Sequence, residues 1–132
     1  MNHKGRKTNR ASLEKMFTGK DKNSLVAIEM LLKIETQELK MERQSVYEYD
    51  DIYFVEEFYG EIGNLGVTVQ YKKKQLAITG KYYMFIETDK ERIEYKTRVA
   101  SKAWSLCNKA ERIKEDSIVA SEEALDDILS QL

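Results

Sequence analysis

The sequence predicts an α+β domain built on one antiparallel sheet. Apolar residues with helical spacing occur near both ends of the chain, whereas the middle shows the two-residue alternation that is typical of strands. Alternating βαβ units are missing, so helices and strands are segregated along the chain. The expected order is N-terminal helices, a three-stranded antiparallel β-meander, a long C-terminal helix and a short terminal helix.

Length and composition favour one folded unit preceded by a basic segment. The chain has 132 residues, which fits one domain, and 42% of them are hydrophobic, enough for a packed core. We expect residues 1–23 to form a flexible basic N-terminal arm and residues 24–132 to form a single α+β domain. The arm has room for a short helix that Ser12 would cap and Gly19 would end. The apolar face of that helix would consist of Leu13, Met16 and Phe17.

A longer helix is expected over residues 24–43, with Asn23 or Ser24 as its N-cap. Side chains on one side of this segment repeat with the period of a helix and should be buried. They are Leu25, Ile28, Leu31, Leu32 and Leu39.

The next segment, residues 46–62, fits two patterns. Tyr47 and Tyr49 alternate with acidic residues as in a strand. Other apolar residues have helical spacing, namely Ile52, Val55, Tyr59 and Ile62. We expect a short helix at residues 51–59, ended by Gly60.

The meander is expected in the second half of the chain. Apolar residues alternate with smaller or polar ones from Leu65 to Tyr71, which predicts the first strand. A polar turn at residues 72–74 would lead to a second strand that contains Leu76 and Ile78. After a turn at Gly80, the aromatic and branched residues 82–86 predict the third strand.

Two capping patterns predict the C-terminal helices. Thr88 and Glu91 have the spacing of a capping box, which would open a helix that runs to about Glu115. Ser121 would cap a last helix whose first turn is acidic, as the helix dipole favours. The apolar stripe of this last helix consists of Leu125, Ile128, Leu129 and Leu132.

Several classes of protein and site are disfavoured. No apolar run reaches the roughly 18–20 residues that a bilayer span needs, and no signal-peptide pattern is present, so we expect a cytoplasmic protein without membrane contact. Cys107 is the only cysteine and His3 the only histidine, which excludes an internal disulfide and argues against a structural zinc site. The same scarcity argues against a Ser-His or Cys-His catalytic pair. No cofactor is expected.

Charge is distributed unevenly along the chain. Residues 1–23 contain seven basic and two acidic side chains, a net charge of +5, whereas the total for the chain is −1. Residues 24–132 therefore carry −6. A basic segment of this kind can neutralise phosphates without a fixed docking geometry, although it can also serve only to keep the chain soluble. The candidate nucleic-acid-binding residues are Lys4, Arg6, Lys7, Arg10, Lys72, Lys73 and Lys74.

An acidic and aromatic stretch lies in the middle of the chain. Between Gln44 and Tyr71 there is no Lys or Arg. Aromatic residues interleaved with charges are typical of protein interfaces, so this stretch could engage a basic protein partner. The alternative is a partly buried element whose aromatic rings pack in the core. The candidate partner-binding residues are Tyr49, Asp50, Asp51, Tyr53, Glu56, Glu57 and Glu61.

The charge partition predicts a small non-enzymatic binding protein, a regulator or inhibitor of the kind that phages and plasmids encode. It would act through the basic arm on nucleic acid, through the acidic and aromatic surface on a protein, or through both. One alternative is a magnesium-dependent nuclease that uses Glu57 or Glu61 together with Glu87 and Asp89. The other is a structural subunit that forms homo-oligomers through its C-terminal helix.

Overall fold

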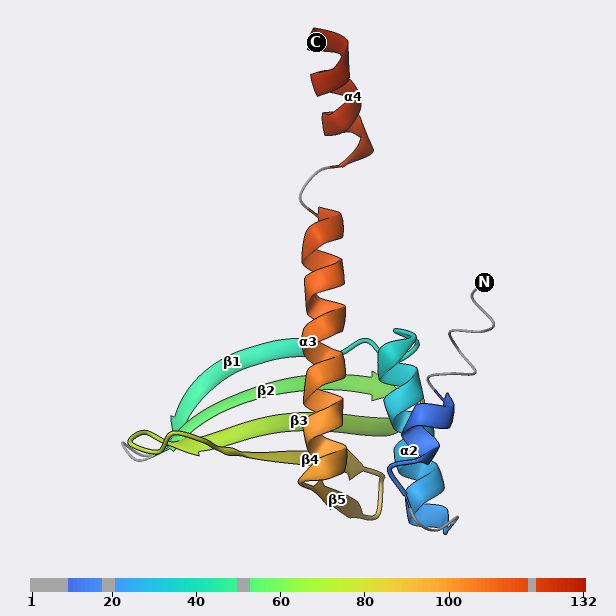
Figure 1. Ribbon diagram of the computed structural model, residues 1–132, viewed down its shortest axis with the longest axis vertical. Helices are drawn as coiled ribbons and strands as arrows, with labels where there is room; N and C mark the ends of the chain where they lie inside the picture. The colour runs from blue at the N-terminus through green and yellow to red at the C-terminus, as the bar shows by residue number, and fades with distance from the viewer. Residues whose placement is uncertain (1–9, 18–20, 50–52, 119–120) are drawn as a thin grey trace.

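The protein is a two-layer α+β structure in which an antiparallel sheet is covered by helices on one face (Figure 1). The computed structural model describes residues 10–17, 21–49, 53–118 and 121–132, and the side chains of residues 45–49 and 114–118 are not described. The sheet has five strands in the order β1-β2-β3-β4-β5, each antiparallel to its neighbours. The predicted α+β class is confirmed, but the three-stranded meander is wrong because the sheet has two further strands.

The elements follow one another with short connections. A short helical segment at residues 10–14 precedes the longer elements. These are α2 (Lys22–Glu35), β1 (Glu42–Tyr49), β2 (Tyr53–Ile62), β3 (Leu65–Lys74), β4 (Lys81–Glu87), β5 (Arg92–Lys96), α3 (Arg98–Ile118) and α4 (Glu122–Gln131).

The short helix expected at residues 51–59 is wrong, because the described part of this segment belongs to β2. Val55 and Ile62 belong to the apolar series whose spacing predicted the helix. In the strand these two side chains lie on opposite faces of the sheet. All ten residues of β2 pair with β3 through a turn at Gly63, whose φ of 57° suits a residue without a Cβ.

The helix expected at residues 24–43 is shorter than predicted. It begins after Asp21, whose carboxylate accepts a hydrogen bond from the Ser24 amide at 3.0 Å, so neither Asn23 nor Ser24 is the N-cap. It ends at Glu35, and Gln37 then adopts a left-handed φ of 63°, which turns the chain towards β1. Leu39 is buried as expected, although it lies in the loop after the helix.

Thr88 caps a turn and not a helix. Its hydroxyl accepts hydrogen bonds from the amides of Lys90 and Glu91, and its own amide donates to the Glu91 carbonyl. The turn leads back into β5, and α3 begins only at Arg98. The hydroxyl therefore satisfies amides as expected, but residues 92–96 pair with β4 instead of forming a helix.

The second expected strand of the meander is also wrong. Lys72, Lys73 and Lys74 form the end of β3, and the chain turns only after them. Leu76 and Ile78 lie in the loop between β3 and β4 and are fully exposed, at 102% and 97% of their reference areas. Residues 65–71 and 82–86 are strands, as expected.

The core lies between the sheet and the helices. Alternate sheet residues point at α3, whose small residues Ala100 and Ala103 allow the helix to approach closely. The Trp104 ring packs edge-on against Phe58, with the ring centroids 5.1 Å apart. Leu13 from the short helical segment is buried in the same core, so residues 10–17 pack on the body although they were assigned to the arm.

The C-terminal end of the molecule extends away from the sheet. Figure 1 shows α3 crossing the strands and continuing past β1, with α4 beyond it. Ser121 caps α4 as predicted, because its hydroxyl accepts from the Ala124 amide at 3.1 Å. No residue of α4 is buried, so its apolar stripe faces water.

Candidate nucleic-acid interface

The sheet has one face that no described helix covers, which we call the open face. Phe58, Val69 and Met84 are directly paired across β2, β3 and β4 and lie on the opposite, covered face against α3. Because side chains alternate along a strand, their neighbours in sequence point to the open face. Tyr95 lies on the covered face and donates a hydrogen bond to Asn23, which places the start of α2 on that side too.

Lysines and tyrosines gather at one end of the open face. Strand pairing aligns Tyr53 with Lys74, Lys72 with Lys81, and Tyr83 with Lys96. Directly paired residues of antiparallel strands have their side chains on the same face. We call this group the lysine–tyrosine patch, and its members are Tyr53, Lys72, Lys74, Lys81, Tyr83 and Lys96.

A pocket of about 350 Å³ lies within the patch, between the strands and the β3–β4 loop. Its lining includes Lys72, Lys81 and the rings of Tyr53 and Tyr83. Gly80 shapes its floor, because a Cβ at this position would lie 2.5 Å from the Lys72 carbonyl oxygen. Only glycine allows the loop to approach β3 this closely.

The lysines of the pocket have no acidic partner within the described part of the chain. Lys72 places its ammonium 4.5 Å from the centroid of the Tyr53 ring, a cation–π contact. Lys96 belongs to the patch but does not line the pocket, and it pairs with Glu94 at 3.4 Å. Asp50 and Asp51 lie outside the described residues. Positive charge therefore concentrates at this end of the described sheet.

Aromatic rings continue the patch across the open face. Tyr83 and Phe85 are two residues apart on β4, and their rings are nearly parallel with centroids 6.2 Å apart. The guanidinium of Arg92 lies 3.9 Å from the centroid of the Phe85 ring. The tyrosine and phenylalanine rings are half-buried, so part of each is accessible. Lysines can hold phosphates, and accessible aromatic rings beside them can stack on bases.

The opposite half of the open face is acidic. Glu57 accepts a hydrogen bond from Gln70 at 3.3 Å, and Glu61 accepts one from the Tyr59 hydroxyl at 2.9 Å. The bond to Glu61 and desolvation together raise the pKa of Tyr59. The open face is therefore bipolar, with a basic end near the β3–β4 loop and an acidic end near the β2–β3 turn.

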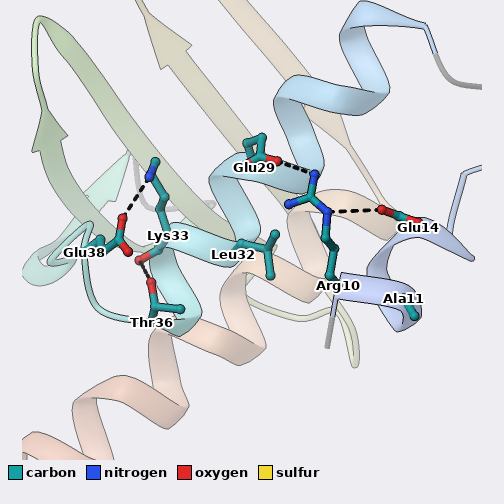
Figure 2. A pocket seen from close by; sticks show the side chains of 8 residues that line it. All are labelled: Arg10, Ala11, Glu14, Glu29, Leu32, Lys33, Thr36 and Glu38. Atoms are coloured by element: carbon teal, nitrogen blue, oxygen red, sulfur yellow. Dashed lines mark hydrogen bonds and ion pairs between the residues drawn. The ribbon is translucent and has the colours of Figure 1, made fainter. Parts of the chain in front are cut away.

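The candidate nucleic-acid residues are divided by the structure. Lys4, Arg6 and Lys7 lie outside the described residues. Arg10 forms ion pairs with Glu14 and Glu29 at a pocket between the short helical segment and α2 (Figure 2). These pairs raise the pKa of Arg10, and the hydrogen bond to Glu29 is the largest cause.

The three consecutive lysines of β3 are also divided. Lys72 and Lys74 belong to the lysine–tyrosine patch, whereas Lys73 is paired with Phe54 and points to the other face of the strand. Lys81, Lys96, Tyr83 and Phe85 were missed by the sequence analysis. The strand predicted at residues 82–86 contained part of the signal, but only the register of β4 against β3 shows that Lys81 lies beside Lys72.

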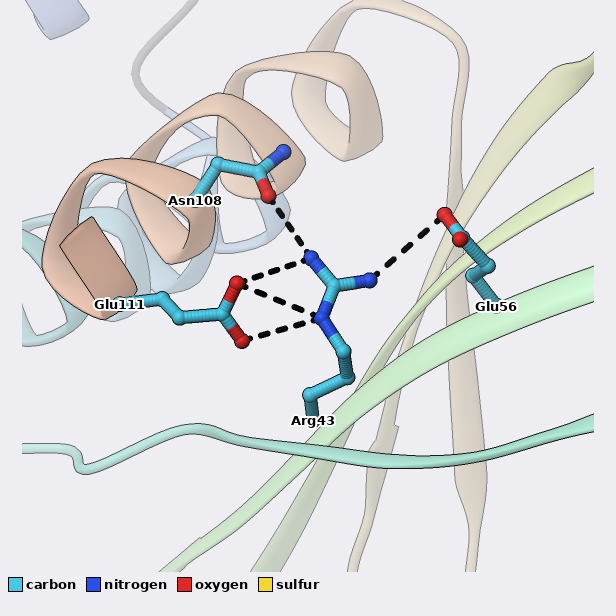
Figure 3. A network of polar contacts seen from close by, with 4 residues as sticks. All are labelled: Arg43, Glu56, Asn108 and Glu111. Atoms are coloured by element: carbon cyan, nitrogen blue, oxygen red, sulfur yellow. Dashed lines mark hydrogen bonds and ion pairs between the residues drawn. The ribbon is translucent and has the colours of Figure 1, made fainter. Parts of the chain in front are cut away.

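The candidate partner-binding residues that the structure describes lie on both faces of the sheet. Asp50 and Asp51 lie outside the described residues, and of Tyr49 only the backbone is described, in β1. Tyr53 belongs to the patch, while Glu57 and Glu61 lie on the acidic half. Glu56 points to the covered face and pairs with Arg43 at 3.6 Å (Figure 3).

Chemistry that depends on a metal or a thiolate has no support among the described residues. They contain no group of three or more His, Cys, Asp or Glu side chains that could hold a metal ion, so the carboxylates of the nuclease hypothesis do not converge. Burial raises the pKa of Cys107 to about 12, with a smaller contribution from Glu111. A thiol of this kind is a poor nucleophile at neutral pH.

Comparisons with protein-family models, curated proteins and solved structures found no match to this chain. In the described part of the chain, no helix combines the length and apolar character that crossing a membrane requires. The candidate interface therefore rests on its own geometry.

Proposed function

We propose that this protein is a non-enzymatic nucleic-acid-binding protein that holds single strands on the open face of its sheet. The observation that carries the proposal is the lysine–tyrosine patch. Lys72, Lys74 and Lys81 have no acidic partner among the described residues, and the rings of Tyr53 and Tyr83 lie beside them. This combination provides electrostatic attraction and stacking surfaces on the same face.

The arrangement favours single strands over duplexes. An accessible ring stacks on the face of a base, and base faces are available only where bases are unpaired. The lysines would contact phosphates, which carry no sequence information, so binding should depend strongly on salt and weakly on sequence. Regulation or inhibition would follow from covering a strand that another protein needs.

The first prediction concerns the lysines. We expect Lys74→Ala/Lys81→Ala to weaken binding of a fluorescent 20-nucleotide single strand roughly tenfold or more at 0.1 M salt. The slope of log K against log salt should fall by about 1.4, because each lost phosphate contact accounts for about 0.7 on single strands. Fluorescence anisotropy titrations at several salt concentrations measure both quantities.

A matched control removes the same charge elsewhere. Lys40→Ala/Lys90→Ala changes two exposed lysines that lie near the opposite ends of the strands and should leave affinity nearly unchanged except for a small general loss. A second variant, Tyr83→Leu, should weaken binding by about 1 kcal/mol without altering the salt slope, because it removes stacking and no charge. Equal effects of the patch and control variants would refute the proposal.

A further inference from the structure

Helix α4 carries an apolar face that nothing in the described molecule covers. Leu125, Ile128 and Leu129 are between 48% and 68% exposed, and Leu132 just beyond the helix is 95% exposed. The same short helix carries four carboxylates and no Lys or Arg; the acids are Glu122, Glu123, Asp126 and Asp127. It is therefore an acidic amphipathic helix presented to solvent, a form that suits docking into a partner.

The loop between β3 and β4 has the opposite character. We call residues 72–81 the β3–β4 tip. Its Leu76 and Ile78 side chains are fully exposed, at 102% and 97% of their reference areas. The same segment carries four lysines and no acidic residue; the lysines are Lys72, Lys73, Lys74 and Lys81. The tip is therefore a basic surface with an apolar centre.

These two surfaces complement each other in both charge and polarity. We propose that α4 of one copy docks on the β3–β4 tip of a second copy. Exposed leucine and isoleucine side chains would be buried on both sides, while the carboxylates of α4 would meet the positive charge of the tip. The contact is placed between copies because α4 extends away from the body beyond the end of α3, whereas the tip lies at the far end of the strands (Figure 1).

The size of the contact indicates a weak and reversible association. A ten-residue helix is about 15 Å long, and stable interfaces bury about 800 Å² on each partner, more than one face of such a helix provides. The contact joins two different surfaces, so a pair of copies still has one free helix and one free tip for further copies. Assembly should therefore increase with protein concentration and decrease with salt.

Docking of α4 on the tip would also regulate nucleic-acid binding, and this regulatory step alone rests on the proposed function. The carboxylates of α4 would occupy the lysines that hold phosphates, so nucleic acid and a second copy would compete for the tip. Bound single strands should then dissociate the assembly. The assembly itself does not require that the protein bind nucleic acid.

The test uses charge reversal on each side of the contact. Variant A is Asp126→Lys/Asp127→Lys, and variant B is Lys73→Glu/Lys74→Glu. In sedimentation velocity without nucleic acid, the weight-average mass of the unmodified protein should rise with concentration. For A alone and for B alone it should stay at the mass of a single copy. An equimolar mixture of A and B should assemble again, because the unaltered helix of B can then dock on the unaltered tip of A.

The mixture distinguishes the proposal from its rivals. Docking of α4 within its own chain predicts no rescue on mixing, and pairing of α4 with α4 predicts that B assembles normally; either result would overturn the proposal. A monomeric unmodified protein at all concentrations would overturn it as well. The matched control Lys40→Glu/Lys90→Glu should assemble like the unmodified protein, and circular dichroism should show that all variants are folded.

Adding nucleic acid to the assembled protein then tests the proposed function and the contact between copies separately. A saturating single-stranded 20-mer should return the unmodified protein to one copy. If instead the assembly persists while the oligonucleotide fails to bind, the proposed function is refuted and the contact between copies stands. If the oligonucleotide binds and the assembly persists, competition for the tip is refuted.

Discussion

At the scale of single residues, Arg43 links the edge strand β1 to α3. Its guanidinium contacts the Glu111 carboxylate at 3.0 Å and the Asn108 side-chain oxygen at 3.0 Å, as Figure 3 shows. The same group lies 4.6 Å from the centroid of the Phe58 ring. A planar guanidinium can make these contacts together, whereas an ammonium cannot. Arg43 therefore contacts polar side chains of α3 and an aromatic ring of the core at the same time.

Replacing Arg43 should destabilise the fold. We expect Arg43→Ala to lower the free energy of unfolding by about 2 kcal/mol, because charged hydrogen bonds to partly buried groups are lost and Glu111 keeps its charge. Arg43→Lys should recover only part of this loss. Denaturation by urea measures both values, with Arg92→Ala as a control at an exposed arginine. A change below about 0.5 kcal/mol in Arg43→Ala would show that the network contributes little.

At the scale of elements, the sequence predicted strands and helices best where local pattern and tertiary pairing agree. Residues 65–71 alternate between apolar and polar or small side chains, residues 82–86 are rich in aromatic and branched ones, and both segments are strands. The spacing of Val55, Tyr59 and Ile62 imitated a helix, but in β2 Val55 is buried on the open face and Phe58 on the covered face. No local signal reveals that both faces of a strand bury a residue, since the neighbouring strands are distant in sequence.

The candidate site was also predictable only where the local sequence pattern was enough. Lys72 and Lys74 stood out as a basic run in the sequence, and they belong to the patch. Lys81 and Tyr83 could not be assigned to it without the strand register, which depends on the turn after β3. The sequence also could not show that Arg10 pairs with Glu29, because the two residues come from separate segments.

The N-terminus of α2 gives a prediction about pH. Hydrogen bonds from Ser24 lower the pKa of Asp21 from its ordinary value of 3.8. A carboxylate whose pKa is lower in the folded than in the unfolded protein stabilises the fold at pH values above its unfolded-state pKa. This stabilisation is lost as the pH falls through its folded-state pKa. Asp21→Asn keeps a capping side chain but does not titrate. The melting temperature of the unmodified protein should therefore exceed that of Asp21→Asn at pH 7, and the gap should close below about pH 4.

Thermal denaturation followed by circular dichroism between pH 7 and pH 3 measures this gap. Asp89→Asn removes the same charge from an exposed turn and serves as the control for general charge effects. A gap for Asp21→Asn that stays constant over the whole range would contradict the role assigned to the carboxylate charge.

At the scale of the whole molecule, positive charge lies at two places. Residues 1–9 contain Lys4, Arg6 and Lys7 and no acidic residue, a net charge of +3 with His3 neutral, which leaves −4 for the remainder of the chain. Arg10 already belongs to the body, where Glu14 and Glu29 neutralise it. The second place is the lysine–tyrosine patch at the end of the sheet. In the proposed function, a nucleic-acid strand on the open face would lie against a body that is acidic overall, and the positive charges of residues 1–9 would offset that repulsion.

Deleting residues 1–9 tests whether both places act on one ligand. We expect weaker binding of the single-stranded 20-mer and a salt slope lower by about 2, because three phosphate contacts at about 0.7 each are lost. The deletion combined with Lys74→Ala/Lys81→Ala should reduce the slope by the sum of the separate changes, since independent contacts add. A variant with Lys4, Arg6 and Lys7 replaced by Gln keeps the chain length and should match the deletion. If that variant binds like the unmodified protein, the N-terminal charges do not contact the strand, and the patch alone has to account for the affinity.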